Sequence, residues 1–355
     1  MIFNIEKLVQ PHLRKIIPYQ SARRIGGKGS IWLNANESPF SIENTIKRNN
    51  LNRYPECQPK NLILKYASYS NVNFKNILVT RGSDEGIDLL SRTFCIPEKD
   101  SIMIFPPTYD MYSVTAKIMG INVKQVPLLK NWDLDILNIK LHIKNVKIIY
   151  LCRPNNPTGN CFSIQSIKKI LEIAYKRAIV VVDEAYIEFC YDKNISSWIH
   201  KYSHLVILRT LSKAFSLAGL RCGFLVSNKK IIKILSKIIP PYPISIPTSD
   251  IAEEALSKKN IDIIKKNVVL LNQNKNWLIE SLKKNVLVEK IYDSDANYIL
   301  VKFYSSHKVF TFLWNKGIIL RDQSKKTNLK RYLRISIGTK NECLILIKSL
   351  NSLKL

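Results

Sequence analysis

The sequence predicts an α/β fold, in which a mostly parallel sheet is covered by helices on both faces and a smaller α/β domain follows at the C-terminal end. Short apolar runs alternate with helical patterns between about residue 75 and residue 227, which is typical of strands buried on both faces of a parallel sheet. The chain has 355 residues, of which 46% are hydrophobic. A chain of this size and composition can bury the cores of one large and one small domain.

The elements of the large sheet can be placed in order along the chain. We expect strands at residues 77–80, 101–105, 122–126, 146–151, 179–182, 205–209 and 222–227. A helical pattern over residues 85–94 follows the first strand, and another helix follows Thr108. In open sheets of this kind, ligands bind beyond the carboxyl ends of the strands. Polar residues that directly follow these strands are therefore candidates for a common site.

The two ends of the chain depart from this alternating pattern. The proline-rich residues 240–243 are followed by a helix-rich stretch to about residue 285, and then by strands at residues 298–301 and 332–335. The first 40 residues show little sustained periodicity after a short initial helix, as expected of an arm that packs on another part of the protein. We therefore divide the chain into an N-terminal arm with part of the small domain (1–45), a large domain (46–245) and a small C-terminal domain (246–355).

The charge of the chain is strongly positive, with 55 Lys and Arg against 27 Asp and Glu. A basic protein of this kind could bind nucleic acid through its phosphate backbone. However, the lysines are scattered in ones and twos along the whole chain, without a zinc-finger or RNA-binding signature. We interpret the charge as a solvated surface and expect no nucleic-acid partner.

The cysteine and histidine content argues against disulfides and metal sites. The seven cysteines form no Cys-x-x-Cys pair, so neither a disulfide framework nor a zinc site is indicated. His200 and His204 are four residues apart but have no nearby acidic residue to complete a metal site. The N-terminus lacks the pattern of a secretion signal, and no apolar stretch approaches the length of a membrane helix. We therefore expect a cytoplasmic protein without a membrane partner.

Three short blocks carry the candidate chemistry, and each follows one of the expected strands. The blocks are Arg153-Pro154-Asn155-Asn156-Pro157-Thr158-Gly159, Asp183-Glu184-Ala185-Tyr186 and Thr210-Leu211-Ser212-Lys213-Ala214-Phe215. Lys213 offers an amine that can form a Schiff base with an aldehyde, and Asp183 offers an acid that can keep a pyridine nitrogen protonated. Arg221, with the hydroxyls of Thr210 and Ser212, can bind a phosphate. Together these residues predict a pyridoxal 5'-phosphate site in the large domain.

At these blocks the chain resembles the fold-type I aminotransferases, and the blocks are most similar to those of the histidinol-phosphate aminotransferases in that family. The resemblance covers nearly the whole chain, including Pro18-Tyr19-Gln20-Ser21-Ala22-Arg23, Trp32-Leu33-Asn34-Ala35-Asn36-Glu37, Arg53-Tyr54-Pro55-Glu56 and Leu333-Arg334-Ile335-Ser336-Ile337-Gly338. It implies a fold-type I transferase fold and a homodimer with shared active sites. It also implies the transamination of L-histidinol phosphate with 2-oxoglutarate, which gives imidazole-acetol phosphate and glutamate in histidine biosynthesis.

The resemblance implies roles for further residues around the cofactor. Lys213 would move the proton between substrate and cofactor as general base and acid. Tyr186 and Asn156 would hydrogen-bond the phenolic oxygen of the cofactor, and Tyr109 would stack on its ring. The phosphate would also be bound by the backbone amides of two residues at the start of the helix after the first strand. These two residues are Ser83 and Asp84.

The substrate site is also implied by the resemblance. Arg334 would bind the carboxylate of glutamate or 2-oxoglutarate with its planar pair of donors. Arg334 and Arg321 would together bind the phosphate of histidinol phosphate, in a pocket lined by Tyr19 and Asn156. Tyr54 would also line the pocket and would reach the cofactor phosphate of the neighbouring subunit.

Other functions remain open at this point. An aromatic or broad-specificity amino-acid aminotransferase, or a phosphothreonine decarboxylase, would use the same lysine site in the same fold. A basic nucleic-acid-binding or regulatory protein is the alternative outside the enzymes, but it would need a separate DNA-reading domain. One residue departs from the pattern of the family, because Arg153 stands where a small residue is common before Pro154.

Overall fold

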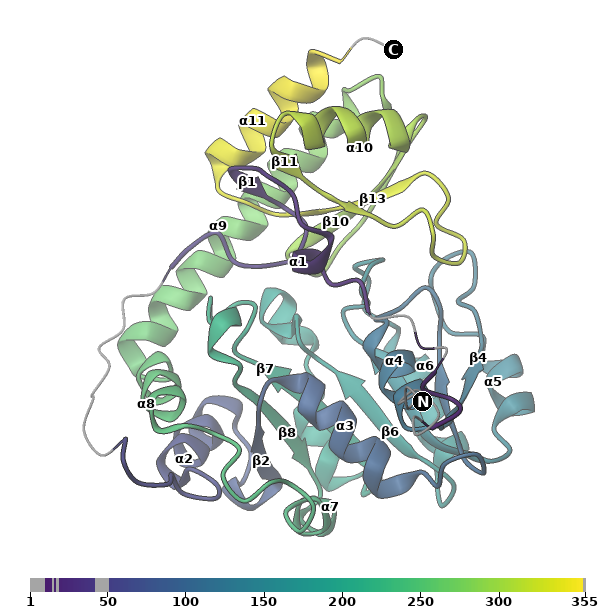
Figure 1. Cartoon of the computed structure of the whole chain (residues 1–355), viewed down its shortest axis with the longest axis vertical. Helices are drawn as coiled ribbons and strands as arrows, with labels where there is room; N and C mark the ends of the chain where they lie inside the picture. The colour runs from purple at the N-terminus through teal and green to yellow at the C-terminus, as the bar shows by residue number, and fades with distance from the viewer. Residues whose placement is uncertain (1–9, 15, 17–18, 42–50, 354–355) are drawn as a thin grey trace, which may run out of the picture.

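The computed structural model describes residues 10–14, 16, 19–41 and 51–353. The short initial helix expected at the N-terminus and parts of the expected arm lie outside these residues. Within the described residues, the larger part of the molecule is built on a seven-stranded sheet with the order β2-β8-β7-β6-β5-β3-β4 (Figure 1). The strands are β2 (Ile77–Thr80), β3 (Ser101–Ile104), β4 (Asn122–Gln125), β5 (Val146–Cys152), β6 (Ile179–Asp183), β7 (Leu205–Thr210) and β8 (Gly223–Ser227).

The expected α/β fold with a mostly parallel sheet is confirmed, and one strand differs from its neighbours in direction. Strands β4, β3, β5, β6 and β7 run parallel, whereas β8 is antiparallel to both β7 and β2. The physical reason lies in the connection from β7 to β8. It contains Lys213 and the short 3-10 helix η5 (Ala218–Leu220), and it has no crossover helix of the kind that joins parallel neighbours.

Both faces of the sheet are covered, as expected for parallel strands. Along β5, the side chains of Ile148 and Tyr150 pack in one core, and those of Ile149 and Leu151 pack in the core on the other face. The helices around the sheet are α2 (Lys60–Ser70), α3 (Ser83–Phe94), α4 (Met111–Ile118), α5 (Ile136–His142), α6 (Ile164–Ala174) and α7 (Lys229–Leu235). The 3-10 helices η2 (Phe74–Asn76), η3 (Ile187–Lys193) and η4 (Ser196–His200) complete this part.

Helix α6 shows how the local sequence specifies these elements. The hydroxyl of Ser163 accepts a hydrogen bond from the amide of Ser166 and so caps the helix start, which typically stabilises a helix by about 1 kcal/mol. Ile167, Ile170 and Leu171 are buried at the spacing of one helix face. The helix therefore begins where its cap stands, and it packs its apolar face against the sheet.

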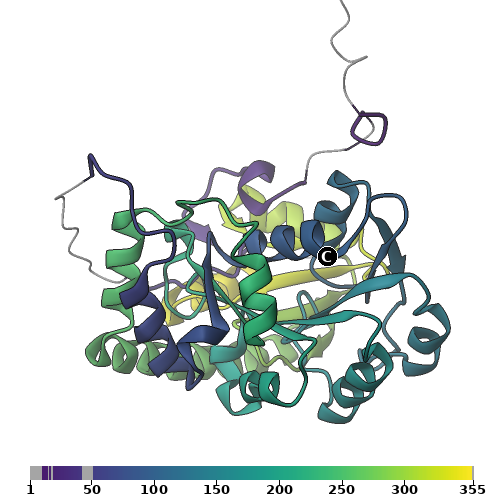
Figure 2. The ribbon, with the colours of Figure 1, turned by 90° about the horizontal axis from the view of Figure 1, so that it is seen from below.

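The smaller part is built on an antiparallel sheet of order β12-β13-β10-β9, with a short parallel pair of β1 and β11 beside it. Its strands are β1 (Ile31–Trp32), β9 (Val288–Tyr292), β10 (Tyr298–Phe303), β11 (Ile318–Ile319), β12 (Arg321–Asp322) and β13 (Tyr332–Ser336). Its helices are α1 (Ala22–Ile25), α9 (Lys258–Lys283), α10 (Ser306–Asn315) and α11 (Lys340–Asn351), and α8 (Ile246–Ala255) contacts both α2 and α9. The segment with α1 lies beside the C-terminal elements in both views (Figure 2).

The two parts meet closely at the loop that follows β5. The amide of Asp295 donates to the carbonyl of Gly159 at 2.8 Å, and Gly159 has a φ of +85°. A Cβ atom at this glycine would overlap the side chain of Ser294. This close approach places residues of the C-terminal part next to the loop that contains Asn156.

In the part of the chain that the structure describes, no helix is both long and apolar enough to cross a membrane.

Candidate active site

A cavity of about 500 Å³ lies between the larger and the smaller part. It brings together nearly all the residues that the sequence predicted for the site. The predicted residues that line it are Tyr19, Ser83, Asp84, Tyr109, Asn156, Asp183, Tyr186, Thr210, Ser212, Lys213, Arg221, Arg321 and Arg334. Tyr54 lies outside it; its side chain is 80% exposed and stacks on Tyr242 with ring centroids 4.5 Å apart.

Lys213 occupies the turn after β7. Its Nζ donates to the carbonyl oxygen of Ala35 at 3.1 Å and lies 5.7 Å from the ring centre of Tyr186. Burial, reinforced by the positive charge of Arg334, lowers the pKa of Lys213 to about 8. A lysine with this pKa is partly neutral near pH 7.5, and a neutral amine can attack an aldehyde.

Asp183 is the last residue of β6, and its carboxylate is buried at the floor of the cavity. Its Oδ2 accepts a hydrogen bond from the hydroxyl of Tyr112 at 2.8 Å, and its Oδ1 accepts from the amide of Ala185 at 3.1 Å. Burial raises the pKa of Asp183 to about 6, although both hydrogen bonds lower it. A positively charged partner would therefore stabilise the ionised form of this buried carboxylate.

A hydrogen-bond network connects this floor to the smaller part. The hydroxyl oxygen of Tyr186 accepts from Nδ2 of Asn36 at 3.1 Å and from Nδ2 of Asn156 at 3.4 Å. Nη1 of Arg334 donates to Oδ1 of Asn156 at 2.6 Å, and its Nη2 donates to the carbonyl of Asn34 at 2.7 Å. The orientation of Asn156 thus depends on Arg334 from the smaller part.

An anion-binding corner is formed where α3 begins. Gly82 precedes the helix with a φ of +75° and has no side chain to cap the first amides. A Cβ atom at Gly82 would lie 2.7 Å from Nη2 of Arg221. Nη1 of Arg221 donates to Oγ of Ser212 at 3.4 Å, and Oγ1 of Thr210 donates to the same oxygen at 2.9 Å. Helix-start amides, a guanidinium and hydroxyls together fit a phosphate group.

A positively charged region lies where the smaller part borders the cavity. Nη2 of Arg321 donates to the carbonyl of Gln20 at 2.7 Å. Two buried donors in this region, Nη1 of Arg321 and Nε of Arg334, have no hydrogen-bond partner among the described residues. Tyr19 lines the same cavity, and its pKa is raised by burial and by the charge of Asp110. Unpaired guanidinium donors of this kind can bind an anion.

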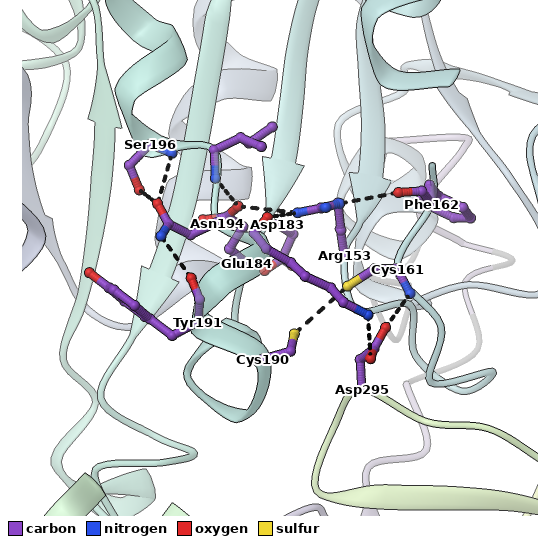
Figure 3. Close-up of polar contacts among 12 residues, drawn as sticks. Arg153, Cys161, Phe162, Asp183, Glu184, Cys190, Tyr191, Asn194, Ser196 and Asp295 are labelled. Atoms are coloured by element: carbon purple, nitrogen blue, oxygen red, sulfur yellow. Dashed lines mark hydrogen bonds and ion pairs between the residues drawn. The ribbon is translucent and has the colours of Figure 1, made fainter. Parts of the chain in front are cut away.

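Arg153, the residue that departs from the family pattern, does not line this cavity. It is buried in a network behind β6, where Nη1 lies 3.8 Å from Oε1 of Glu184 and Nε donates to the carbonyl of Phe162 (Figure 3). Arg209 completes the network, with Nε 2.9 Å from Oε2 of Glu184 and Nη1 2.9 Å from Oε1 of Glu188. The charge of Arg153 is therefore compensated inside the protein, and removing one member of such a network costs about 3–5 kcal/mol.

Near this network, Figure 3 shows the thiols of Cys161 and Cys190 close together, with sulfur atoms 3.8 Å apart. Nζ of Lys193 forms an ion pair with Oδ1 of Asp295 at 2.7 Å, which joins the larger to the smaller part.

In the described ranges, no group of three or more His, Cys, Asp and Glu side chains is placed to hold a metal ion.

Several residues of the site were not identified from the sequence. Asn36 stands in one of the blocks that carry the resemblance, so the signal existed but no role was assigned to it. Tyr112 follows Tyr109 by three residues, and nothing in the sequence indicates its bond to Asp183. Lys326 also lines the cavity, but in a lysine-rich chain its position has no distinguishing pattern.

Comparison with known proteins agrees with this geometry. Residues 28–350 match the model of the family described as aminotransferase class I and II. The chain is 54% identical over 352 residues to histidinol-phosphate aminotransferase of Buchnera aphidicola subsp. Acyrthosiphon pisum (strain APS), covering 99% of this chain and 96% of that protein. It is 49% identical over 339 residues to the Salmonella typhi histidinol-phosphate aminotransferase, covering 96% and 94%.

A solved structure shows the same fold. The crystal structure of histidinol-phosphate aminotransferase from Sinorhizobium meliloti, in complex with pyridoxal-5'-phosphate, superimposes with a TM-score of 0.83 and covers 98% of each chain at 18% identity. The family match spans most of the chain, and the relatives named above are aligned over nearly their full lengths. The chain therefore belongs to the aminotransferase class I and II family and, within it, to the histidinol-phosphate aminotransferases.

Proposed function

We propose that this protein is a pyridoxal-5'-phosphate-dependent aminotransferase that transfers the amino group between L-histidinol phosphate and 2-oxoglutarate in histidine biosynthesis. The observation that carries the proposal is the placement of an amine, a buried acid and two separate anion-binding regions around one cavity. These are supplied by Lys213, Asp183, Arg221 and the Arg321–Arg334 pair. The relatives at 54% and 49% identity support histidinol phosphate as the substrate.

The residues of the cavity fit the cofactor at each of its polar groups. The corner at Gly82, Ser212 and Arg221 would hold the phosphate, with the amides of Ser83 and Asp84. Asp183 would lie against the ring nitrogen, because a buried carboxylate of raised pKa is stabilised by a cation. Tyr186 and Asn156 would hydrogen-bond the phenolic oxygen, and Tyr109 would stack on the ring.

When bound, the cofactor supplies an electron sink for the negative charge that develops at the substrate carbon. Lys213 would hold the cofactor in the absence of substrate, and its Nζ would accept and return the substrate proton. Its lowered pKa suits both tasks, because the amine is available as a base near neutral pH. Tyr112 keeps the carboxylate of Asp183 in place by donating to Oδ2.

The substrates alternate at the positively charged region. The phosphate of histidinol phosphate and the carboxylate of glutamate would each occupy the region of Arg321 and Arg334, which offers unpaired donors. Tyr19 and Asn156 line the space between this region and the cofactor. The bond from Arg334 to Asn156 would couple substrate binding to the position of the cofactor's phenolic oxygen.

We further propose that two chains form a homodimer with shared sites in the cytoplasm. Tyr54 is highly exposed although its ring is stacked on Tyr242, as fits a residue that completes the site of a neighbouring subunit. Free thiols throughout the described chain fit a reducing compartment. Residues 46–245 form the cofactor-binding domain in this proposal, and residues 246–355 with part of the arm form the small domain.

The experiment that tests the function follows the absorbance of the cofactor in single-turnover reactions. The holoenzyme is mixed with histidinol phosphate, with glutamate, with aromatic amino acids and with phosphothreonine. We expect conversion to the amino form of the cofactor with the first two, and imidazole-acetol phosphate as product of the first. A preference for aromatic amino acids, or release of carbon dioxide from phosphothreonine, would contradict the proposed substrate.

A further inference from the structure

Lys326 connects the two parts of the molecule at the edge of the cavity. It lies between β12 and β13, in the smaller part. Its Nζ donates to Oδ1 of Asp110 at 2.7 Å and to the carbonyl of Thr108 at 2.8 Å, and both residues belong to the larger part. Its side chain is only 22% exposed. An ammonium group has three hydrogens, and these two bonds leave one of them for a further acceptor.

Lys326 and Asp110 share the cavity with the two arginines of the substrate region. Burial lowers the pKa of Lys326, Asp110 opposes this effect, and Arg334 and Arg321 lower it further. Burial and the charge of Arg334 lower the pKa of Arg321, and Asp110 opposes this shift. Burial raises the pKa of Tyr19, and Asp110 adds to that rise. These side chains therefore interact electrostatically as one group, and an anion that enters this region meets the charge of all of them.

The charges of this group match a phosphate dianion. Arg321, Arg334 and Lys326 are cations and Asp110 is an anion, so the four side chains carry a net charge of +2. Without Lys326 the net charge would be +1, which matches a carboxylate, and Asp110 would face the incoming anion without its partner. The other carboxylates that line the cavity belong to the cofactor region: Asp84 is paired with Arg221, the charge of Glu37 acts on Lys213, and Asp183 lies at the floor.

We propose that Lys326 is a specificity-determining residue that favours a phosphate-bearing substrate over a carboxylate-bearing one. It does so by neutralising Asp110, so that the incoming anion meets the two undiminished charges of Arg321 and Arg334. This inference rests on the proposed function, because it assigns the phosphate of the substrate to this region. Lys326 does not act in the proton transfer and touches neither Lys213 nor Asp183 in the hydrogen bonds of the described residues.

The test compares two lysines that are neighbours in sequence. Lys326→Gln removes the charge in the cavity, whereas Lys325→Gln removes the same charge from an exposed residue that does not line it. For each holoenzyme, kcat/KM is measured with histidinol phosphate and with glutamate. We expect kcat/KM for histidinol phosphate, divided by kcat/KM for glutamate, to fall about tenfold in Lys326→Gln, equivalent to ~1.4 kcal/mol. In Lys325→Gln it should change by less than about twofold, because solvent and salt screen an exposed charge.

Two more variants separate specificity from a mechanical role of the ion pair. Lys326→Gln combined with Asp110→Asn restores the net charge of +2 and should recover most of the preference, although the ion pair is lost. Lys326→Arg keeps the charge and should keep the preference. If the pair only tied the two parts together, the double variant would stay impaired and both substrates would lose equally, which would overturn the inference.

Binding of inorganic phosphate to the holoenzyme, measured by calorimetry, gives a readout that does not depend on turnover. The dissociation constant should rise about tenfold in Lys326→Gln and remain close to that of the wild type in Lys325→Gln. An unchanged constant in Lys326→Gln would contradict the inference. Failure of the wild type to react with histidinol phosphate would instead contradict the proposed function, so the two failures can be distinguished.

Discussion

Asp183→Asn should make the cofactor-free protein more stable and the enzyme much slower. The carboxylate of Asp183 is buried, and its pKa is raised from the usual 3.8 to about 6. The folded protein therefore keeps this proton to a higher pH than the unfolded chain does. As pH rises from about 4 to about 6, the unfolded chain releases the proton first, and the free energy of unfolding falls.

The size of this effect follows from the two pKa values. The difference between 3.8 and about 6 corresponds to about 3 kcal/mol, at ~1.4 kcal/mol for each pKa unit. Asparagine has the shape of the protonated aspartic acid and cannot ionise. We therefore expect Asp183→Asn to match the wild type at pH 4 and to be about 3 kcal/mol more stable at pH 8. An amide cannot hold the charge of the pyridinium, so single-turnover proton abstraction should slow by orders of magnitude.

Urea denaturation of the cofactor-free proteins at pH 4 and pH 8 measures the stability difference, and cofactor absorbance in single turnovers measures the rate. Asp88→Asn is the matched control, because Asp88 is 39% exposed and pairs with Arg92 on the surface; its effect should stay within about 1 kcal/mol at both pH values. A gain in Asp183→Asn that is absent at pH 8, or equal at both pH values, would refute the reasoning. Proton abstraction at the wild-type rate would remove Asp183 from the mechanism.

The remaining predictions concern the substrate region and the dimer. Arg334→Ala should weaken both substrates, since it also removes the donor to Asn156, whereas Arg321→Ala should raise the KM of histidinol phosphate more than that of glutamate; equal losses in Arg321→Ala would argue against its phosphate role. Hybrid dimers of Lys213→Ala and Tyr54→Ala subunits should be more active than either parent, because one of the two shared sites is then intact. Differentially tagged hybrids without this rescue would contradict shared sites.

The positions of most strands could be predicted because they are apolar runs, and several of these runs end at a polar residue. Asp183 directly follows Val180, Val181 and Val182 at the end of β6, and strand pairing then places it beside its neighbours at the same edge. The direction of β8 could not be predicted from its own residues, since an apolar strand of this kind fits either direction. It depends on the short connection that contains Lys213.

The candidate site was predicted well where one short block supplies several groups, and poorly where contacts join distant segments. Arg153 contacts Glu184 at the ends of two adjacent strands, β5 and β6, and Lys326 contacts Asp110 across the two parts of the molecule. Tyr112 reaches Asp183 from α4. None of these pairs has a local signal, because the partners approach only through tertiary packing. In a chain with 55 Lys and Arg, the sequence alone also does not distinguish the few cations that line the cavity from the many on the surface.

The central claim is that Lys213 carries the cofactor in this cavity. Reduction of the holoenzyme with sodium borohydride, followed by proteolysis and mass spectrometry, would locate the modified residue directly. We expect the pyridoxyl label on the peptide that contains Lys213, and we expect Lys213→Ala to bind the cofactor without covalent attachment, since the phosphate corner at Gly82 and Arg221 is intact. A label on another lysine of the wild-type protein, or no covalent label at all, would contradict the claim.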